Sequence, residues 1–547
     1  MIHGRGPAGG DVPARERGFA LAVTLAYAAT LAVVLGRHEP WLDELQAWML
    51  ARDSASLGAL RANARYEGHP LLWHALLFAA SRVSRAPEAM QALNWALATA
   101  GAYVTARYAP FGRVQRGLLA FGYFGLFEYG VVSRSYALGA LLLAAACALH
   151  ARGRRWSAAA ALALLAQAHA YGALVAGAFA AAAAAEYLAW DRAARRPRLL
   201  PGGRGALGLL AAVGAAGLVS AAQAVPPADA FFGAVRPTRD RPAELVDALR
   251  PLGAVARAYL PVPARSAWPG LWETSALDFL TNRLEWRGLG AGAAWLLVYG
   301  AASAAMVAVA GAALWRRRGA FLLYALGTGA ILLFGLVRFP GTLRHHGQLF
   351  LVLVAALWWA ADAGPVVGAS ARPRVRGWRA WVAGPLFSAL LVTHVAAAAV
   401  LVAADVRYPF SGARATAELL RRRGLDALPF VGAPRTTAVT VAGFLDRPVY
   451  HVEEGRVGTY AMWGRATAAD PPDSAVYAAA RAYLRSGAPA VVVVTGHALP
   501  PAPGDLAVEV AGRAAGVVHR GESYEASVVR WRPGALAVRR GPAGAER

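Results

Sequence analysis

Long apolar stretches almost free of charged residues recur along the first 404 positions of the chain. Clear examples are Phe19 to Leu35, Ala89 to Ala106, Leu289 to Trp315 and Ala380 to Ala404. Each is close to the ~20 residues that an α-helix needs to cross about 30 Å of hydrocarbon. The pattern predicts a polytopic α-helical membrane protein.

The arginines between the apolar stretches predict the orientation, because cytoplasmic loops are enriched in Lys and Arg. Arg5, Arg15 and Arg17 precede the first stretch, which places the N-terminus in the cytoplasm. Pro70 to Ala80 is too short to span, so we expect it to lie on the outer surface. If 70–84 crossed instead, all the later arginine clusters would face outward. Those clusters are Arg107/Arg113/Arg116, Arg152/Arg154/Arg155, Arg192 to Arg204, Arg316 to Arg318 and Arg372 to Arg379.

This arrangement gives about eleven spans, with the loops 36–88 and 226–288 outside. Trp156 to Trp190 must then form two short helices that join near His169, since a single span would put arginines on both sides. The expected spans lie near 19–35, 89–106, 117–133, 135–151, 156–171, 172–190, 205–225, 289–315, 319–337, 347–363 and 380–404.

The pattern changes after Ala404, so we divide the chain into a transmembrane domain, 1–404, and a soluble domain, 405–547. Ala413 to Arg423 and Ser474 to Ser486 have the character of helices, and Ala490 to Thr495 that of a strand. Alternation of the two kinds predicts an α/β domain. No glycine-rich phosphate loop follows a strand, and the eleven spans place this domain outside the cytoplasm.

Composition agrees with the apolar pattern. The chain is 57% hydrophobic and 16% charged, with a mean hydropathy of +0.39 and a net charge of +24. A nucleic-acid surface would need its arginines on one soluble face, whereas these lie between spans, so no nucleic-acid partner is expected. The single cysteine, Cys147, rules out an intramolecular disulfide.

Two adjacent carboxylates, Asp43 and Glu44, follow the first span, and Glu67 and His69 lie farther along the same outer loop. Carboxylates at a membrane surface are costly and often functional, although acids also favour the first turn of any helix. We expect Asp43 to be a general base, because burial near lipid raises a carboxylate pKa toward the useful range.

Glu128, at the outer end of the third span, is a second candidate catalytic acid. The segment continues to Arg134 and Tyr136, and a structural ion pair between Glu128 and Arg134 is the alternative. His169 is expected to face the same outer cavity, unless it is only hydrogen-bonded within the bundle.

Arg338, Arg344, His345 and His346 gather between two late spans, on the side opposite the cytoplasmic arginines. Arginine offers a planar fork of donors that matches phosphate, so this cluster predicts an anion site. A lipid headgroup is the alternative ligand. A metal is not expected, because neighbouring histidines diverge along a helix or strand.

These features together resemble the GT-C superfamily of membrane glycosyltransferases, which includes protein O-mannosyltransferases and bacterial aminoarabinose transferases. The resemblance covers roughly residues 15–365 and is carried by Asp43-Glu44, a His-Pro-Leu-Leu segment from His69, and Ser-Arg-Ser-Tyr ending at Tyr136. The order and sidedness of these motifs carry the likeness, since no single motif is specific.

The resemblance implies transfer of a sugar from a polyprenyl-phosphate donor to an extracytoplasmic glycan, lipid or protein, with inversion. Asp43, with Glu44 beside it, takes the place of the first-loop catalytic acid, and Glu128 that of the second-loop acid. No cofactor is identified with certainty, and a divalent cation stays open. Tyr and Gly after Glu128, in place of a second acid, put a metal-dependent reaction in doubt.

Two other classes of function compete with this one. A transporter or flippase would share the spans, but would more often show internal repeats and interrupted helices at mid-membrane. A membrane-anchored binding protein would leave Asp43, Glu44 and Glu128 unexplained. The Ala-, Arg- and Gly-rich composition is typical of a GC-rich bacterial genome, which predicts the plasma membrane as the location.

Overall fold

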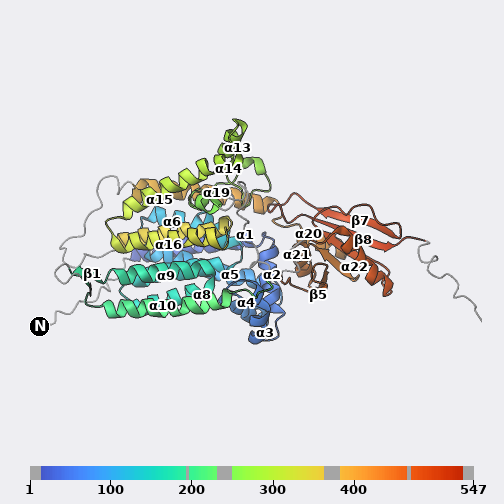
Figure 1. Cartoon of the computed structure of the whole chain (residues 1–547), viewed down its shortest axis with the longest axis horizontal. Helices are drawn as coiled ribbons and strands as arrows, with labels where there is room; N and C mark the ends of the chain where they lie inside the picture. The colour runs from blue at the N-terminus through green and yellow to red at the C-terminus, as the bar shows by residue number, and fades with distance from the viewer. Residues whose placement is uncertain (1–13, 192–195, 231–248, 363–381, 465–469, 534–547) are drawn as a thin grey trace, which may run out of the picture.

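The computed structural model describes residues 14–191, 196–230, 249–362, 382–464 and 470–533. The expected arginine cluster Arg372 to Arg379 lies outside the described residues, as do Arg192 and part of the expected loop 226–288. Most of the described chain is helical, and a mixed β-sheet region follows at its C-terminal end (Figure 1).

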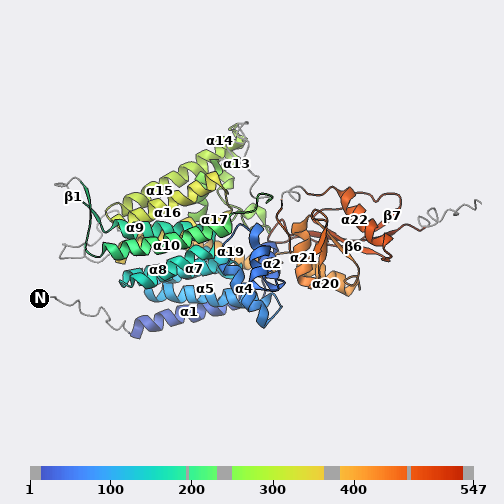
Figure 2. The same cartoon turned by 60° about the horizontal axis from the view of Figure 1, so that its bottom comes forward.

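Long apolar helices run side by side and form a bundle with an alanine-rich core (Figures 1 and 2). Small side chains let helix backbones approach closely, as they do in membrane proteins. The helical segments of the bundle are α1 (Ala14–Leu35), α5 (Glu88–Tyr108), α6 (Arg113–Phe121), η2 (Tyr123–Val131), α7 (Ser135–Ala151), α8 (Arg155–Ala168), α9 (Ala170–Ala185), α10 (Gly203–Ala224), α14 (Ala291–Trp295), η6 (Leu296–Gly300), α15 (Ala301–Leu314), α16 (Arg318–Val337), α17 (Leu343–Asp362), η7 (Val382–Leu386) and α19 (Phe387–Arg407).

Shorter elements complete the first part of the chain. The break between α8 and α9 falls at His169, as the arginine positions indicate. The short elements are α2 (Leu42–Arg52), α3 (Leu57–Asn63), η1 (Ala64–Tyr66), α4 (Leu72–Val83), β1 (Leu188–Asp191), β2 (Arg196–Leu199), η4 (Arg250–Gly253), α12 (Ala254–Tyr259), η5 (Arg265–Ala267) and α13 (Asp278–Trp286).

Five helices among the described residues are long and apolar enough to cross a membrane, so the chain is a multi-pass membrane protein. They are Ala14–Leu35, Gly203–Ala224, Ala291–Leu314, Arg318–Val337 and Gly384–Arg407. The expected number of about eleven is wrong by this measure.

The physical reason lies in length and polarity. α7, the longest of the short apolar helices at 17 residues, reaches only about 26 Å at 1.5 Å per residue. α6 ends at Phe121, and Gly122 separates it from η2. α5 and α17 have 21 and 20 residues, but each carries several polar side chains in its first turns.

The two ends of the bundle differ in character. At one end, which we call the arginine end, Arg113 and Arg116 pair with Glu16 of α1, and Arg318 donates to the carbonyl of Leu188. At the other end, the sheet end, α1 and α19 finish, and the β-sheet region lies beyond them (Figures 1 and 2).

The C-terminal region contains one mixed six-stranded sheet in the order β5-β4-β3-β6-β8-β7. β4, β3 and β6 are mutually parallel, whereas β5, β8 and β7 join antiparallel. β6 is apolar and fully buried, as expected for a central strand. Its elements are α20 (Ala413–Arg422), β3 (Phe430–Ala433), α21 (Arg435–Leu445), β4 (Val449–His451), β5 (Arg456–Gly458), α22 (Asp473–Arg485), β6 (Val491–Thr495), β7 (Leu506–Ala514) and β8 (Tyr524–Trp531).

Helix α2 lies between the bundle and the sheet region (Figure 2). Its apolar residues share a core cluster with Val439 of α21 and with Ala461. Gln46 exchanges two hydrogen bonds of 2.9 Å with the backbone of Ala461, and Arg52 pairs with Asp446 at 2.8 Å. The segment 36–88, which the sequence predicts to be the first outer loop, therefore contacts both the bundle and the sheet region through α2.

Candidate functional site

Helix α2 begins with the two carboxylates that the sequence singles out. The backbone N–H of Trp41, the residue before the helix, donates to the Glu44 carboxylate at 3.2 Å. This is half of a capping box, in which an acid at the third helical position satisfies an orphan N–H group. Glu44 thereby fixes the first turn, and Asp43 projects from the same turn.

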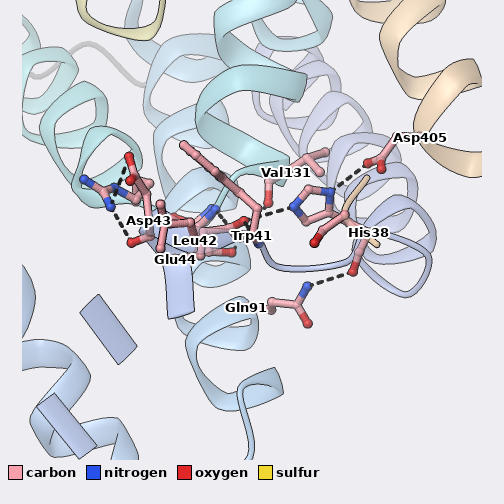
Figure 3. Close-up of polar contacts among 12 residues, drawn as sticks. His38, Trp41, Leu42, Asp43, Glu44, Gln91, Val131 and Asp405 are labelled. Carbon is pink, nitrogen blue, oxygen red and sulfur yellow. Dashed lines mark hydrogen bonds and ion pairs between the residues drawn. The ribbon is translucent and has the colours of Figure 1, made fainter. Parts of the chain in front are cut away.

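Glu44 is buried and belongs to a network that ties three segments together (Figure 3). One carboxylate oxygen accepts from the backbone N–H of Ser133 at 2.6 Å. The other lies 3.2 Å from Nε2 of His38, whose Nδ1 lies 2.8 Å from Asp405 at the end of α19. Gln91 of α5 donates to the His38 carbonyl at 3.3 Å.

His38 carries a positive charge in this network. Burial by itself would lower the pKa of His38, but Asp405 and Glu44 outweigh burial and raise it to about 10. Both ring nitrogens are then donors, one to each carboxylate. The imidazolium thus compensates two buried carboxylates where α1 and α19 end.

Asp43 faces the interior of the sheet end and is held by two arginines. Its Oδ2 lies 2.8 Å from Nη2 of Arg344 and 3.6 Å from Nη1 of Arg134. Arg134 also donates to the Asp43 carbonyl. The Nε atoms of both arginines are buried and have no hydrogen-bond partner among the described residues.

The expected rise in the Asp43 pKa does not occur. Burial raises the pKa of this carboxyl, but Arg344 and Arg134 outweigh burial. The pKa of Asp43 therefore lies below its ordinary value. Asp43 therefore rests as an ionised carboxylate in an ion pair. The prediction from burial alone was wrong because Arg344 comes from a helix 300 residues away.

Glu128 lies in the π-helical segment η2 and is 1% exposed. Its Oε2 accepts from the Tyr123 hydroxyl at 2.7 Å and from Trp272 Nε1 at 3.0 Å. Its Oε1 has no hydrogen-bond partner among the described residues. The alternative ion pair with Arg134 is not formed, because that arginine turns to Asp43.

An aromatic cluster surrounds the Arg344 guanidinium. The guanidinium carbon lies 5.0 Å from the ring centre of Trp41 and 5.7 Å from that of Trp272, within cation–π range. The two indole rings are 4.8 Å apart and nearly perpendicular. Glu273, which has a positive φ of 62°, approaches Arg344 at 4.0 Å.

Glu67 and His69, from the same loop as α2, have different surroundings. Glu67 accepts from Gln46 at 2.8 Å and from Trp463 at 3.0 Å, so it joins α2 to the sheet region. Burial raises its pKa. Burial, aided by Arg134, lowers the pKa of His69 to about 3, so this histidine is neutral beside the arginine.

The remaining predicted residues divide between aromatic packing and loop geometry. Tyr136 is buried and stacks on Tyr129 at 5.3 Å. His169 accepts from Gly172 N at 2.9 Å and caps α9, which is the bundle role given as its alternative. His345 accepts from the Thr342 amide at 3.0 Å.

His346 and Arg338 do not reach Asp43 either. Nε2 of His346 lies 3.0 Å from the Pro340 carbonyl, and Arg338 is exposed at the end of α16. Of the four Arg and His residues in the predicted anion cluster, only Arg344 contacts Asp43.

Several residues of this site were missed by sequence reasoning. Trp272, Glu273 and His519 come from loops without a motif, and only the fold brings them to Asp43. His38 and Asp405 carried a usable signal, because ionisable side chains at the ends of apolar spans are functional candidates.

Within the described residues, no group of three or more His, Cys, Asp or Glu side chains lies close enough to hold a metal ion. The prediction that no metal is bound stays a prediction. A scan against models of protein families, a search of curated proteins and a search of solved structures each find no match to this chain.

Proposed function

We propose that this chain is a GT-C-like membrane glycosyltransferase. It transfers a sugar from a polyprenyl-phosphate donor to an extracytoplasmic glycan, lipid or protein, with inversion at the anomeric carbon. In this proposal the arginine end faces the cytoplasm and the sheet end faces outward, as the positive-inside rule favours. The protein resides in the plasma membrane, and the 405–547 domain lies outside the cytoplasm.

The observation that carries the proposal is the pairing of Asp43 with Arg344 and Arg134. Two cations face one carboxylate, and an Nε–H of each arginine is buried without an acceptor in the part of the chain that the structure describes. Buried donors normally have partners, so this site is prepared for an additional anion. A phosphate group fits the planar donor fork of arginine.

The resting ion pair also explains how an acid with a lowered pKa acts as a base. When the donor phosphate binds, its negative charge offsets that of the arginines, which now hold the Asp43 pKa down. The pKa of Asp43 then rises toward its ordinary value, and the carboxylate becomes a better proton acceptor. Donor binding thus activates the base.

The chemical step follows from these positions. Asp43 accepts the proton of the acceptor hydroxyl as that oxygen forms a bond to the anomeric carbon. The bond from this carbon to the phosphate oxygen breaks, and the phosphate leaves with the electron pair as polyprenyl phosphate. Arg344 and Arg134 stabilise the charge that develops on it. Protonated Asp43 releases its proton to water.

An apolar cavity supports a lipid-linked donor. It has a volume of about 110 Å³ and is bordered by α1, α5, η2, α7 and α17. Tyr129, one of its lining residues, donates its hydroxyl to the Arg344 carbonyl at 2.8 Å. The cavity therefore lies near the backbone of Arg344, the residue whose side chain we assign to the phosphate.

The two other acids take different roles in the proposal. Glu44 positions the first turn of α2, because both of its oxygens are engaged within the protein. Glu128 offers Oε1 as a hydrogen-bond acceptor for a sugar hydroxyl. An acceptor held ready for a substrate hydroxyl also discriminates strongly among sugars.

The test is transfer of radiolabelled sugar from a panel of polyprenyl-phosphate monosaccharides to membrane extract by the purified full-length protein in nanodiscs. We expect Asp43→Asn to lower the rate by about 100-fold or more, the usual contribution of a general base. Glu128→Gln should mainly raise KM. Glu88→Gln, an exposed acid at the same end of the bundle, is the matched control.

A second measurement follows the binding of polyprenyl phosphate alone. Arg344→Gln should weaken binding, whereas Glu88→Gln should not. If Asp43→Asn protein transfers sugar at the wild-type rate, the assignment of the base is wrong. If the wild type transfers no sugar from any donor but moves labelled lipid between leaflets, a flippase replaces the glycosyltransferase.

A further inference from the structure

The loop 515–523, between β7 and β8, reaches from the sheet region to the candidate site. It contacts three segments that lie far apart in the sequence: the chain after α19, the loop before α13, and the start of α2. The contacts are His519 N to Phe410 O at 3.1 Å, Arg520 Nη2 to Ala267 O at 3.2 Å, and Leu42 N to Glu522 Oε1 at 3.4 Å.

His519 projects its ring from this loop onto the aromatic cluster. Its ring centre lies 4.7 Å from that of Trp41 and 4.7 Å from that of Trp272, at angles of 62° and 59°. The contact with Trp41 has the edge-to-face geometry that is favourable for aromatic pairs, and the contact with Trp272 is tilted. His519 therefore contacts both indole rings that make cation–π contacts with Arg344.

These two indoles connect to both candidate catalytic acids. Trp41 precedes α2 and is two residues from Asp43, and Trp272 donates its Nε1–H to Glu128. Arg344 stacks on both rings and pairs with Asp43. His519, from the C-terminal region, thus packs against Trp41, which lies next to Asp43, and against Trp272, which donates to Glu128.

The protonation of His519 fits a packing role. Burial lowers the pKa of His519 to about 4, with Asp43 acting to raise it and Arg344 to lower it. The ring is neutral at pH 7 and adds no charge beside Arg344. Its Nδ1 accepts from the Gly521 backbone N–H at 3.2 Å, which holds the ring orientation.

We propose that His519 is a positioning residue of the site. By packing against Trp41 and Trp272, it fixes the position of the Asp43–Arg344 pair relative to Glu128. The C-terminal sheet region is then part of the catalytic unit and not a separate binding module. The catalytic consequence rests on the proposed function, whereas the positioning of α2 does not.

The experiment compares His519→Ala, His519→Phe and His519→Gln in the full-length protein. His497→Ala, which removes an exposed histidine of the same region, is the matched control. We expect His519→Ala to lower kcat by about 10- to 100-fold with little change in KM, because small misplacements of catalytic groups have effects of this size. His519→Phe restores the ring and should stay within about 3-fold of wild type.

A second readout needs no enzymatic activity. Hydrogen–deuterium exchange in peptides covering 41–52 should accelerate in His519→Ala but not in His497→Ala. Peptides from β6 and β8 report whether the variant is folded. If no protein transfers sugar, the proposed function fails, and this exchange still decides the positioning role.

Two results would overturn the proposal. Unchanged exchange in α2, together with unchanged kcat in His519→Ala, would show that the ring positions nothing. Recovery of kcat by His519→Gln but not by His519→Phe would show that the imidazole acts as a hydrogen-bonding group toward the substrate.

Discussion

Replacing His38 by glutamine would leave Glu44 and Asp405 buried without their shared cation. The side chains of all three residues are 0% exposed. Removing one partner of a buried ion pair typically costs about 3–5 kcal/mol, because a charge is left uncompensated. The rise of the His38 pKa from 6.5 to about 10 corresponds to about 5 kcal/mol, which agrees in size.

The single cysteine provides the assay. Cys147 is buried in α7, so a thiol-reactive dye labels it only as the bundle opens. The unfolding entropy of 547 residues is about 1.1 kcal/mol/K at the per-residue value for globular proteins. A loss of about 3–5 kcal/mol therefore lowers the apparent Tm by about 3–4 °C.

The pH dependence has a defined sign. Because the folded pKa of His38 is raised, its stabilisation is complete below pH 6.5 and is lost as the pH rises through 10. Thermal melting monitored by circular dichroism should thus give a lower Tm for His38→Gln than for wild type at pH 6. Above pH 10 the two Tm values should be the same. The double variant His38→Gln/Asp405→Asn should recover part of the loss, and His497→Gln is the control. Equal melting of His38→Gln and wild type at pH 6 would refute the reasoning.

Three further substitutions test separate parts of the structure. Trp272→Phe keeps an aromatic ring but removes the donor to buried Glu128, so sugar transfer should fall by about 10-fold and dye melting should show a loss of about 1–3 kcal/mol of stability. Gly347→Ala would place a Cβ 2.3 Å from the Phe124 ring, and low yield of monodisperse protein on size exclusion should follow. His169→Ala removes the N-cap of α9 and should cost about 1 kcal/mol in denaturant melts, with sugar transfer retained.

Much of the arrangement could be predicted from the sequence because it depends on local patterns. Apolar length predicted the bundle, and the arginines predicted the break at His169. The number of spans was overestimated, because an apolar window does not show where a helix ends. Gly122 separates α6 from η2, for example.

The partners of the candidate acids were not predictable. Tyr123 and Glu128 are five residues apart and meet because the π-helical segment η2 brings such positions together, whereas α-helical periodicity pairs positions three or four apart. Arg344, His345 and His346 are consecutive on α17, so each points in a different direction. The placement of α17 in the bundle decided that, of these three residues, Arg344 meets Asp43.

The sequence by itself determined that the chain enters a membrane, and that Asp43, Glu44 and Glu128 are unusual. Both conclusions follow from the free energy of transferring apolar or charged side chains between water and lipid. That free energy is a property of each residue type and does not depend on the fold. Tertiary structure alone decided that Asp43 is paired with Arg344 and that Glu44 is paired with His38. It also decided that Glu128 keeps one oxygen without a partner among the described residues. Those outcomes depend on contacts across hundreds of residues, such as His38 with Asp405 and Trp41 with His519.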